Sequence, residues 1–498
     1  MAGCCVHENH IGRRGFIKLS ALAGAAATIQ AGGGAKPVHG QSAGGAASNF
    51  RAFKASPSGN VRNVLFVTDM PERYEPVINK IREITEYRIT VTPVQVNLLT
   101  DAGTMNAAQI RDADAIVLTM PQVSSSSGRI AATMPEVNSP VIIYPVNFDF
   151  IMLEADVAGQ FRAAGVNALL ANSETHLLEL LKIAVAPRIL EGKKALIFGR
   201  PFDSSSVPAA PPGEEYVYRH TGLRLTYRPI EELRDRLTSV SDADGRAEME
   251  RWKREATEVV ETTDAAILAS SRLYVLLSRI LKEEQLDGIS IDCLSFTFSK
   301  EPMLPYPCLS FTRLRDEGYT VPCEADVSGM LTSMILEEIG KRPSYTANVS
   351  EVKEEKSTVI LRHCVSPMKV MGYDSPAMPY RLRDYHGMGG VTAEIQFPMG
   401  VEVTMGGFSK DLREFVAWPG RIIPRVRDTD APSFPGSQMR KYCTNHLEAR
   451  INDVDSYIQN IGGVHHLMVT GSYRKPLQDA MTRMNVRIIG PSNFSAPA

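Results

Sequence analysis

A carboxylate and two widely separated histidines stand at the edges of apolar segments in the C-terminal half of the chain. Glu324 ends the short apolar run Thr320–Cys323, His363 ends the strand-like run that begins at Ser357, and His465 follows two glycines in IGGVHHLMVTG. Carboxylate oxygens and imidazole nitrogens are common ligands of divalent metal ions. The three residues therefore predict a divalent-metal site if the fold brings their segments together.

The segment after Glu324 carries the signals of a helix. Asp326 has the residue type of an N-cap, apolar residues then recur at helical spacing as far as Ile339, and Gly340 is a stop signal. Glu324 thus lies just before the N-terminus of the predicted helix and directly after a strand-like run. Ligands of α/β proteins tend to bind at such junctions.

Each of these residues also has an ordinary structural role. A glutamate at a helix start is often a solvated residue that the helix dipole favours. Asp326 can be a plain helix cap, and a histidine in an apolar run is more often a hydrogen-bonded core residue than a ligand. The metal site is favoured because these segments occur together, in this order and in similar surroundings.

The chain resembles the L-fucose and L-arabinose isomerases and their relatives over roughly residues 60–498, most closely from Gly288 onward. The resemblance rests on an ordered set of elements: PCLSFTRLRDEG, CEADVSGMLTSMILEEIGKRPSYTANV, LRHC, VEVTMGGFSKDL, YCTNHLEARI and GGVHHLMVTGSY. In those isomerases a divalent metal, typically manganese, binds neighbouring oxygens of the open-chain sugar. The resemblance implies Mn²⁺ or another divalent ion as cofactor, a small-molecule sugar as substrate and a homo-oligomeric assembly.

Carried onto this sequence, the resemblance makes Glu324 the first acidic metal ligand and His465 the late histidine ligand. The histidine used in the arabinose branch corresponds to His363. The second acidic ligand of the fucose branch corresponds to Asn348, which is a departure from that pattern. An amide can coordinate a metal through its oxygen, but it carries no charge and cannot accept a proton.

The implied reaction is the interconversion of an aldose and a ketose through a metal-chelated ene-diol, which requires a base and an acid. Glu324 can be one proton carrier. Because Asn348 occupies the place of the second acidic ligand, the other proton carrier has to be Asp326, Glu351 or a water molecule. We therefore take Glu324, Asp326 and Asn348 as the candidate catalytic residues. An exported sugar-binding protein, or a carbohydrate lyase or epimerase, remains the alternative.

The N-terminal segment predicts export. GRRGFIKLSALAGAAATIQAGG contains Arg13 and Arg14, followed by a mildly apolar run too short for an ordinary membrane helix. This is the layout of a twin-arginine signal, and a basic amphipathic segment without a targeting role is the alternative. We expect residues 1–48 to be signal and linker, the export machinery to be a partner, and the protein to be periplasmic or extracellular.

The composition of the chain excludes some classes of partner and of metal or disulfide site. The formal net charge is −2, and no basic patch with interleaved aromatic residues occurs, so we expect no nucleic-acid partner. The cysteines beyond the predicted signal are odd in number and contain no CxxC pair, which indicates neither a zinc ribbon nor a disulfide scaffold. We expect these cysteines to be buried small residues: Cys293, Cys308, Cys323, Cys364 and Cys443.

The apolar patterns of residues 49–188 predict an α/β domain. Short buried-type strands at Val61–Val67, Ala113–Leu118 and Val141–Val146 are separated by helical stretches such as Val77–Glu86. Alternation of this kind is typical of a doubly wound parallel sheet.

A second doubly wound α/β domain is predicted for residues 189–349, which open with the strand-like KKALIFGR and carry the Glu324 motif. It includes a long charged helical region from Gly245 to Leu286. Residues 350–498 alternate apolar and polar positions between glycine-rich turns, which indicates a β-rich domain that carries both candidate histidine ligands. The metal site would then be assembled from two domains.

Overall fold

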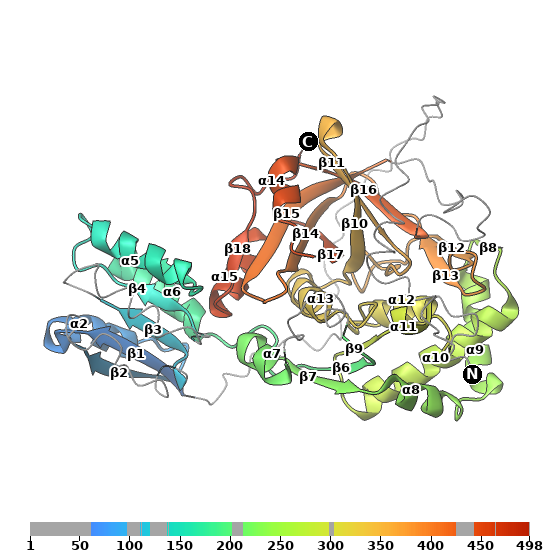
Figure 1. Cartoon of the computed structure of the whole chain (residues 1–498), viewed down its shortest axis with the longest axis horizontal. Coiled ribbons are helices and arrows are strands. Elements are labelled where there is room, and N and C mark those ends of the chain that lie inside the picture. The colour runs from blue at the N-terminus through green and yellow to red at the C-terminus, as the bar shows by residue number, and fades with distance from the viewer. Residues whose placement is uncertain are drawn as a thin grey trace, which may run out of the picture.

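The computed structural model describes residues 61–96, 110, 112–119, 137, 139–201, 213–297, 303–424, 443–463 and 465–497. The predicted twin-arginine segment lies outside these described residues. Within them, no helix has the length and apolar character needed to cross a membrane. Figure 1 shows an N-terminal α/β unit beside a larger body, in which helices and a small sheet lie against a β-rich region.

The N-terminal unit is built on a parallel five-stranded sheet with the order β2-β1-β3-β4-β5. Alternate residues of β1 point to opposite faces. Val64 and Phe66 pack with α2 and α6, whereas Leu65 and Val67 pack with α5. The elements are β1 (Arg62–Thr68), α2 (Pro71–Arg82), β2 (Ile89–Gln95), β3 (Ala115–Leu118), β4 (Val141–Ile143), α5 (Met152–Ala163), β5 (Ala168–Leu170) and α6 (Glu174–Val185).

Some predicted boundaries in this unit are wrong. The helix predicted at 77–86 begins earlier, at Pro71, and ends at Arg82. Proline suits the first turn of a helix because its missing N–H would have no partner there. The third predicted strand is also shorter than expected and ends at Ile143.

The second unit contains a parallel three-stranded sheet with the order β7-β6-β9. Parallel α/β structure is thus confirmed in both units, although three strands do not establish the doubly wound order predicted here. The elements are β6 (Lys194–Phe198), α7 (Glu214–Thr221), β7 (Arg224–Arg228), α8 (Ile230–Leu237), α9 (Asp242–Glu255), α10 (Asp264–Glu283), β9 (Gly288–Ile291), α11 (Leu294–Thr297), α12 (Cys308–Asp316) and α13 (Val327–Gly340).

The region predicted as one helical stretch from Gly245 to Leu286 is divided. Helix α9 ends at Glu255, strand β8 (Glu258–Val260) follows, and α10 begins after Thr263, whose side chain accepts a hydrogen bond from the Ala266 N–H. β8 pairs with β12 (Tyr380–Arg383), which pairs with β13 (Thr392–Ile395). This small sheet joins the second unit to the C-terminal region.

The predicted β-rich C-terminal region is confirmed and is a closed antiparallel barrel. Its strands follow the order β14-β17-β10-β11-β16-β15, and β15 pairs back to β14. β18 (Arg487–Ile489) adds to β15 in parallel. The other elements are β10 (Tyr345–Lys353), η2 (Glu354–Lys356), β11 (Thr358–His363), β14 (Glu402–Phe408), β15 (Glu414–Ile423), β16 (Asn445–Ile451), α14 (Val454–Gln459), β17 (His465–Thr470) and α15 (Arg474–Arg483).

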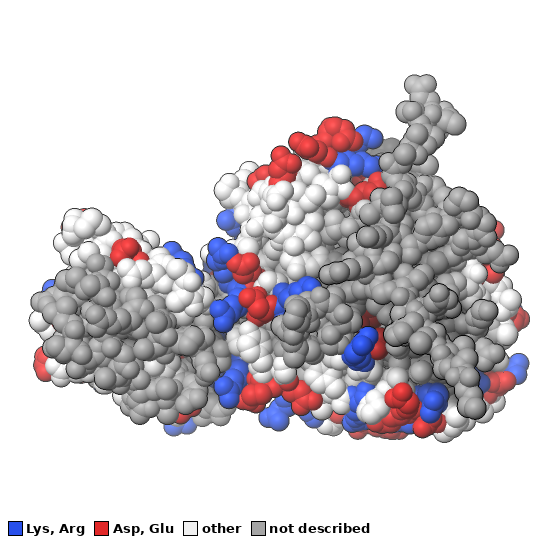
Figure 2. All heavy atoms as spheres, in the orientation of Figure 1, with Lys and Arg blue, Asp and Glu red and all other residues white. Residues whose placement is uncertain are grey.

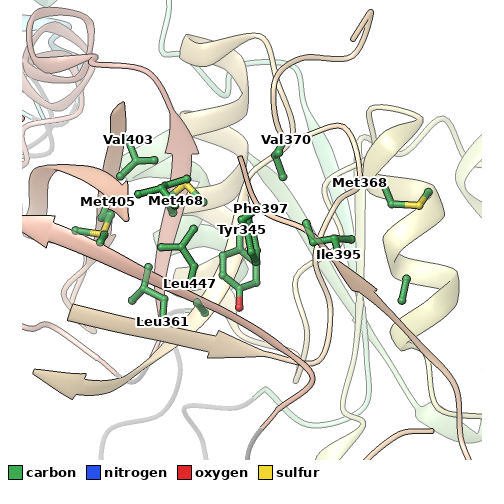
Figure 3. Close-up of a cluster of buried hydrophobic side chains, with 14 of the residues drawn as sticks. Tyr345, Leu361, Met368, Val370, Ile395, Phe397, Val403, Met405, Leu447 and Met468 are labelled. Carbon is green, nitrogen blue, oxygen red and sulfur yellow. The ribbon is translucent and has the colours of Figure 1, made fainter. Parts of the chain in front are cut away.

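The barrel is filled by apolar side chains. Tyr345, Leu361, Val403, Leu447 and Met468 belong to one buried cluster and come from five different strands. Figure 3 shows these side chains converging between the strands. A barrel interior packed in this way is a core and leaves ligands to the outside of the barrel.

Helix α13 lies against the outside of the barrel, where it contacts β10, β14 and β17. The Phe408 N–H of β14 donates to Thr332 Oγ1 of the helix. The N-terminus of α13, with Glu324 just before it, is therefore held next to β17, which carries His465, and β10, which carries Asn348. On the face shown in Figure 2, acidic and basic side chains of the described residues are interspersed.

Candidate metal centre

Glu324, His363 and His465 meet at the junction between the second unit and the barrel. The Nε2 atom of His363 lies 3.6 Å from Glu324 Oε1, and the Nε2 atom of His465 lies 3.5 Å from Glu324 Oε2. One ligand atom from each residue fits within 4.8 Å of the other two. The glutamate side chain is 12 % exposed and the His465 side chain 1 %, so the group is almost enclosed.

Glu324 is presented by a short loop with an unusual backbone. Both Glu324 and Ala325 have positive φ angles, 66° and 54°. Left-handed conformations are costly for residues with a Cβ and are often found at functional sites. Ser290 of β9 stabilises the loop, since its hydroxyl donates to Pro322 O (2.7 Å) and accepts from the Ala325 N–H (3.1 Å).

His465 begins β17, and its ring is oriented by Asp326 at the N-cap of α13. The distance from His465 Nδ1 to Asp326 Oδ2 is 2.7 Å, and Ser328 Oγ donates to the other carboxylate oxygen. A Cβ atom on Gly329 would lie 2.6 Å from Asp326 Oδ2, so only glycine leaves room for this carboxylate. With the ring hydrogen on Nδ1, Nε2 can offer its lone pair to an ion held beside Glu324, as in a metal-binding histidine held by a carboxylate.

His363 comes from the last residue of β11. The Val365 N–H approaches its Nδ1 atom at 3.4 Å, which favours the tautomer with hydrogen on Nε2, facing Glu324. A metal ion bound at Nε2 would shift that hydrogen to Nδ1, because a neutral ligating imidazole offers one lone pair, and the 3.4 Å contact with the Val365 N–H would then be lost.

Asn348 of β10 is paired in register with His465 on β17 and with Arg362 on β11. Cross-strand partners share one face of a sheet, so Asn348 projects on the same side as His465. Among the described residues, Asn348 Oδ1 is buried and accepts no hydrogen bond. A buried carbonyl oxygen without a donor is what a metal ion or a sugar hydroxyl would satisfy. Glu351, by contrast, forms an ion pair with Arg362.

The histidines keep the acidic groups ionised. Burial would raise the pKa of the Glu324 carboxyl, but His465 and His363 outweigh it and lower that pKa below its ordinary value. Burial opposes ionisation of Asp326 in the same way, and the hydrogen bond from His465 lowers its pKa as well. Both groups are therefore carboxylates at neutral pH.

A second cluster, of Cys364, His386 and Cys443, lies beside the first. Its potential ligand atoms are also within 4.8 Å of one another, and Cys364 Sγ lies 3.0 Å from His386 Nε2. The hydrogen bond with Cys364 lowers the pKa of the Cys443 thiol well below its usual value. The sequence pattern predicts these cysteines only as buried residues and does not single out His386. The available signal was that Cys364 directly follows a candidate ligand.

Comparison with known proteins gives a distant similarity. Sulfoquinovose isomerases of Priestia aryabhattai and Priestia megaterium are each 22% identical to this chain over 152 residues, which is 30% of this chain and 33% of the relative. The chain therefore matches about a third of the length of these curated relatives. No protein-family model matches the chain. The chain is thus similar, over part of its length, to isomerases that act on a sugar.

Proposed function

We propose that this protein is a divalent-metal-dependent aldose–ketose isomerase. The observation that carries the proposal is the convergence of Glu324, His363 and His465, with Asp326 orienting one of the histidines. The distant similarity to sulfoquinovose isomerases supports the reaction class. The resemblance to fucose and arabinose isomerases supports sugars of that type as the first substrates to test.

The donor set fits a metal ion. Ligand atoms that bind one ion at about 2.0–2.2 Å are separated by about 3–3.5 Å. The two nitrogen–oxygen distances to Glu324, 3.6 and 3.5 Å, are close to this range. A carboxylate, imidazoles and the oxygen of Asn348 form a nitrogen–oxygen set without sulfur. The carboxylate and amide oxygens suit Mn²⁺, which the resemblance to fucose and arabinose isomerases also favours, and we propose Mn²⁺ as the cofactor.

A bound divalent ion would supply Lewis-acid stabilisation of negative charge on the sugar oxygens. Glu324, ionised at neutral pH, takes the proton from one carbon and returns it to the neighbouring carbon, so one carboxylate can serve both halves of the transfer. Asp326 acts through His465, whose orientation it holds. Asn348 can offer its oxygen or donate a hydrogen bond to a hydroxyl group. Because an amide does not accept a proton, exchange between the sugar oxygens falls to water.

The test is hydrogen exchange at the sugar C2 position. The full chain with Mn²⁺ is incubated in D₂O with fucose, arabinose or sulfoquinovose, and C2 exchange is followed by NMR. We expect exchange by the wild type and none by Glu324→Gln, because the amide cannot take the proton. Glu250→Gln, on the exposed side of α9, is the matched control. Exchange by Glu324→Gln at the wild-type rate would contradict the proposal.

A second candidate function is sugar binding without turnover, and the observation that favours it is the amide at Asn348 in place of a second acid. Calorimetry with and without a chelator separates the two functions. A sugar that binds equally well to chelator-treated protein, with no C2 exchange, would establish the binding function. A sugar that binds only with Mn²⁺ and exchanges its C2 hydrogen would establish the isomerase.

We also propose that the protein works outside the cytoplasm after twin-arginine export, as a homo-oligomer. The export receptor reads a guanidinium pair, which lysine does not reproduce. Replacing Arg13 and Arg14 by lysine should therefore leave the precursor in the cytoplasm, as fractionation would show. Normal export of that variant would contradict the proposed location.

A further inference from the structure

The structure points to a second metal site of different chemistry, formed by Cys364, His386 and Cys443. We propose that these residues bind a thiolate-preferring divalent ion, such as zinc, independently of the Glu324 centre. Three side chains each place one potential ligand atom within 4.8 Å of the other two. Cys364 and His386 are buried, and Cys443 is partly buried.

The distances suit zinc. Bonds of about 2.3 Å to sulfur and about 2.0 Å to nitrogen place tetrahedral ligands roughly 3.5–3.8 Å apart. The observed separation of 3.0 Å between Cys364 Sγ and His386 Nε2 would need to open only slightly to admit an ion. Two thiolates and one imidazole leave the fourth tetrahedral position to water or another ligand. Binding would release the thiol protons, because the ligand is the thiolate.

The backbone around the cluster is fixed independently of any ion. The carbonyl oxygen of Cys364 accepts hydrogen bonds from Asn445 Nδ2 (3.2 Å) and from Thr392 Oγ1. His386 has a positive φ of 52°, which turns the chain sharply between β12 and β13. The three ligands therefore come from the end of β11, the β12–β13 connection and the segment before β16. An ion bound there would cross-link these three segments of the C-terminal region.

The two centres differ in the ions they prefer. Carboxylate and amide oxygens favour manganese or magnesium, whereas thiolates favour zinc or iron. His363 and Cys364 are adjacent in the chain, but their side chains belong to different clusters of potential ligands. The proposed isomerase reaction needs no thiolate. A negative result for the second site would therefore not contradict the proposed isomerase function.

The experiment is Co²⁺ and Zn²⁺ binding to the reduced full chain. Cobalt bound by thiolates gives a sulfur-to-cobalt charge-transfer absorption band in the near ultraviolet, which oxygen and nitrogen ligands do not produce. We expect one equivalent of Co²⁺ to give this band in the wild type, one equivalent of Zn²⁺ to abolish it, and Cys443→Ser to lack it. The matched control is Cys293→Ser, a buried cysteine outside the triad, which should keep the band.

Further variants separate this site from the Glu324 centre and from misfolding. Glu324→Gln should keep the band. His386→Gln should weaken cobalt binding at least about tenfold, because losing even a group that only supports a ligand commonly costs that much. Circular dichroism identifies any variant that does not fold. The proposal is overturned if the reduced wild type gives no band, if Cys443→Ser gives the wild-type band, or if mass spectrometry finds a Cys364–Cys443 disulfide in protein purified without oxygen.

Discussion

The Nδ1 atom of His465, on the first residue of β17, lies 2.7 Å from Oδ2 of Asp326, at the N-cap of α13. The two side chains are 1% and 2% exposed. This contact joins the barrel to the second α/β unit inside the protein. A residue of the second unit thus fixes the ring of a candidate metal ligand on the barrel, so the candidate metal centre depends on how the two parts are assembled.

Removing the charge of Asp326 should weaken metal binding. Asp326→Asn keeps an oxygen for the His465 N–H but loses the negative charge that makes the imidazole a better ligand. Losses of such supporting groups commonly cost about 10–100-fold in metal affinity, which Mn²⁺ titration calorimetry would measure. Asp264→Asn, at an exposed site on α10, is the control. Equal Mn²⁺ affinity of Asp326→Asn and wild type would show that the contact is only structural.

Restoring a carboxylate at position 348 should strengthen the centre. Asn348 projects on the same side as His465, and its buried oxygen has no donor among the described residues. A full negative charge there should tighten Mn²⁺ binding about tenfold, or about 1.4 kcal/mol. Asn348→Asp should also raise C2 exchange of a bound sugar, because a second proton acceptor is present. Asn348→Ala, which adds no charge, should show neither gain; a gain in that variant would contradict the interpretation.

Arg315 of α12 should be essential for the position of the Glu324 loop. Its guanidinium group donates to Val321 O, which leads into that loop, and to Ser344 O and Thr346 Oγ1 at the start of the barrel. Arg315→Met leaves buried acceptors without donors and should lower the free energy of unfolding by about 3 kcal/mol. Chemical denaturation measures this.

The control for Arg315→Met is Arg246→Met, at an exposed position of α9. It should change the free energy of unfolding by less than about 0.5 kcal/mol. Because the Glu324 loop loses an anchor, Arg315→Met should also bind Mn²⁺ more weakly than the wild type. A folded Arg315→Met protein with normal stability would mean that the loop is held without this residue.

Asp316 should make the stability depend on pH. Burial raises the pKa of its carboxyl from 3.8 to about 7, although the backbone N–H groups of Lys369 and Met368 partly oppose this. The folded protein thus holds this proton more tightly than the unfolded chain. The resulting stabilisation is complete below about pH 4 and is lost as the pH rises to about 7. A shift of this size corresponds to a loss on the order of 4 kcal/mol.

Asp316→Asn removes the titrating group, so the stability difference between variant and wild type should grow in favour of the variant from pH 4 to pH 7 and then stay constant. Urea unfolding at a series of pH values measures this difference, with Glu250→Gln as the control. A difference that does not change with pH would show that the Asp316 carboxyl does not titrate in this range.

Several features of the site could be predicted from local sequence signals. The helix after Asp326, the strands that end or begin at His363 and His465, and the presence of Glu324 between a strand-like run and a helix all depend on residues close together in the chain. Caps, apolar periodicity and turn residues act over a few positions, so they are readable without the fold. The same local character explains why Gly245–Leu286 was predicted as one region: the short β8 contributes only three residues, too few to interrupt the surrounding helical pattern.

Local signals in the sequence thus predict Glu324, His363 and His465 as candidate metal ligands, together with the elements that carry them. Only the tertiary structure decided that Asp326 serves His465, which is 139 positions away, and that Cys364 meets His386 and Cys443. These contacts depend on the register of the antiparallel strands and on the closure of the barrel by β14 and β15. A shift of one residue in the pairing of β10 with β17 would place His465 and Asn348 on opposite faces of the sheet. No local sequence pattern predicts that register, because the packing of the whole barrel core sets it.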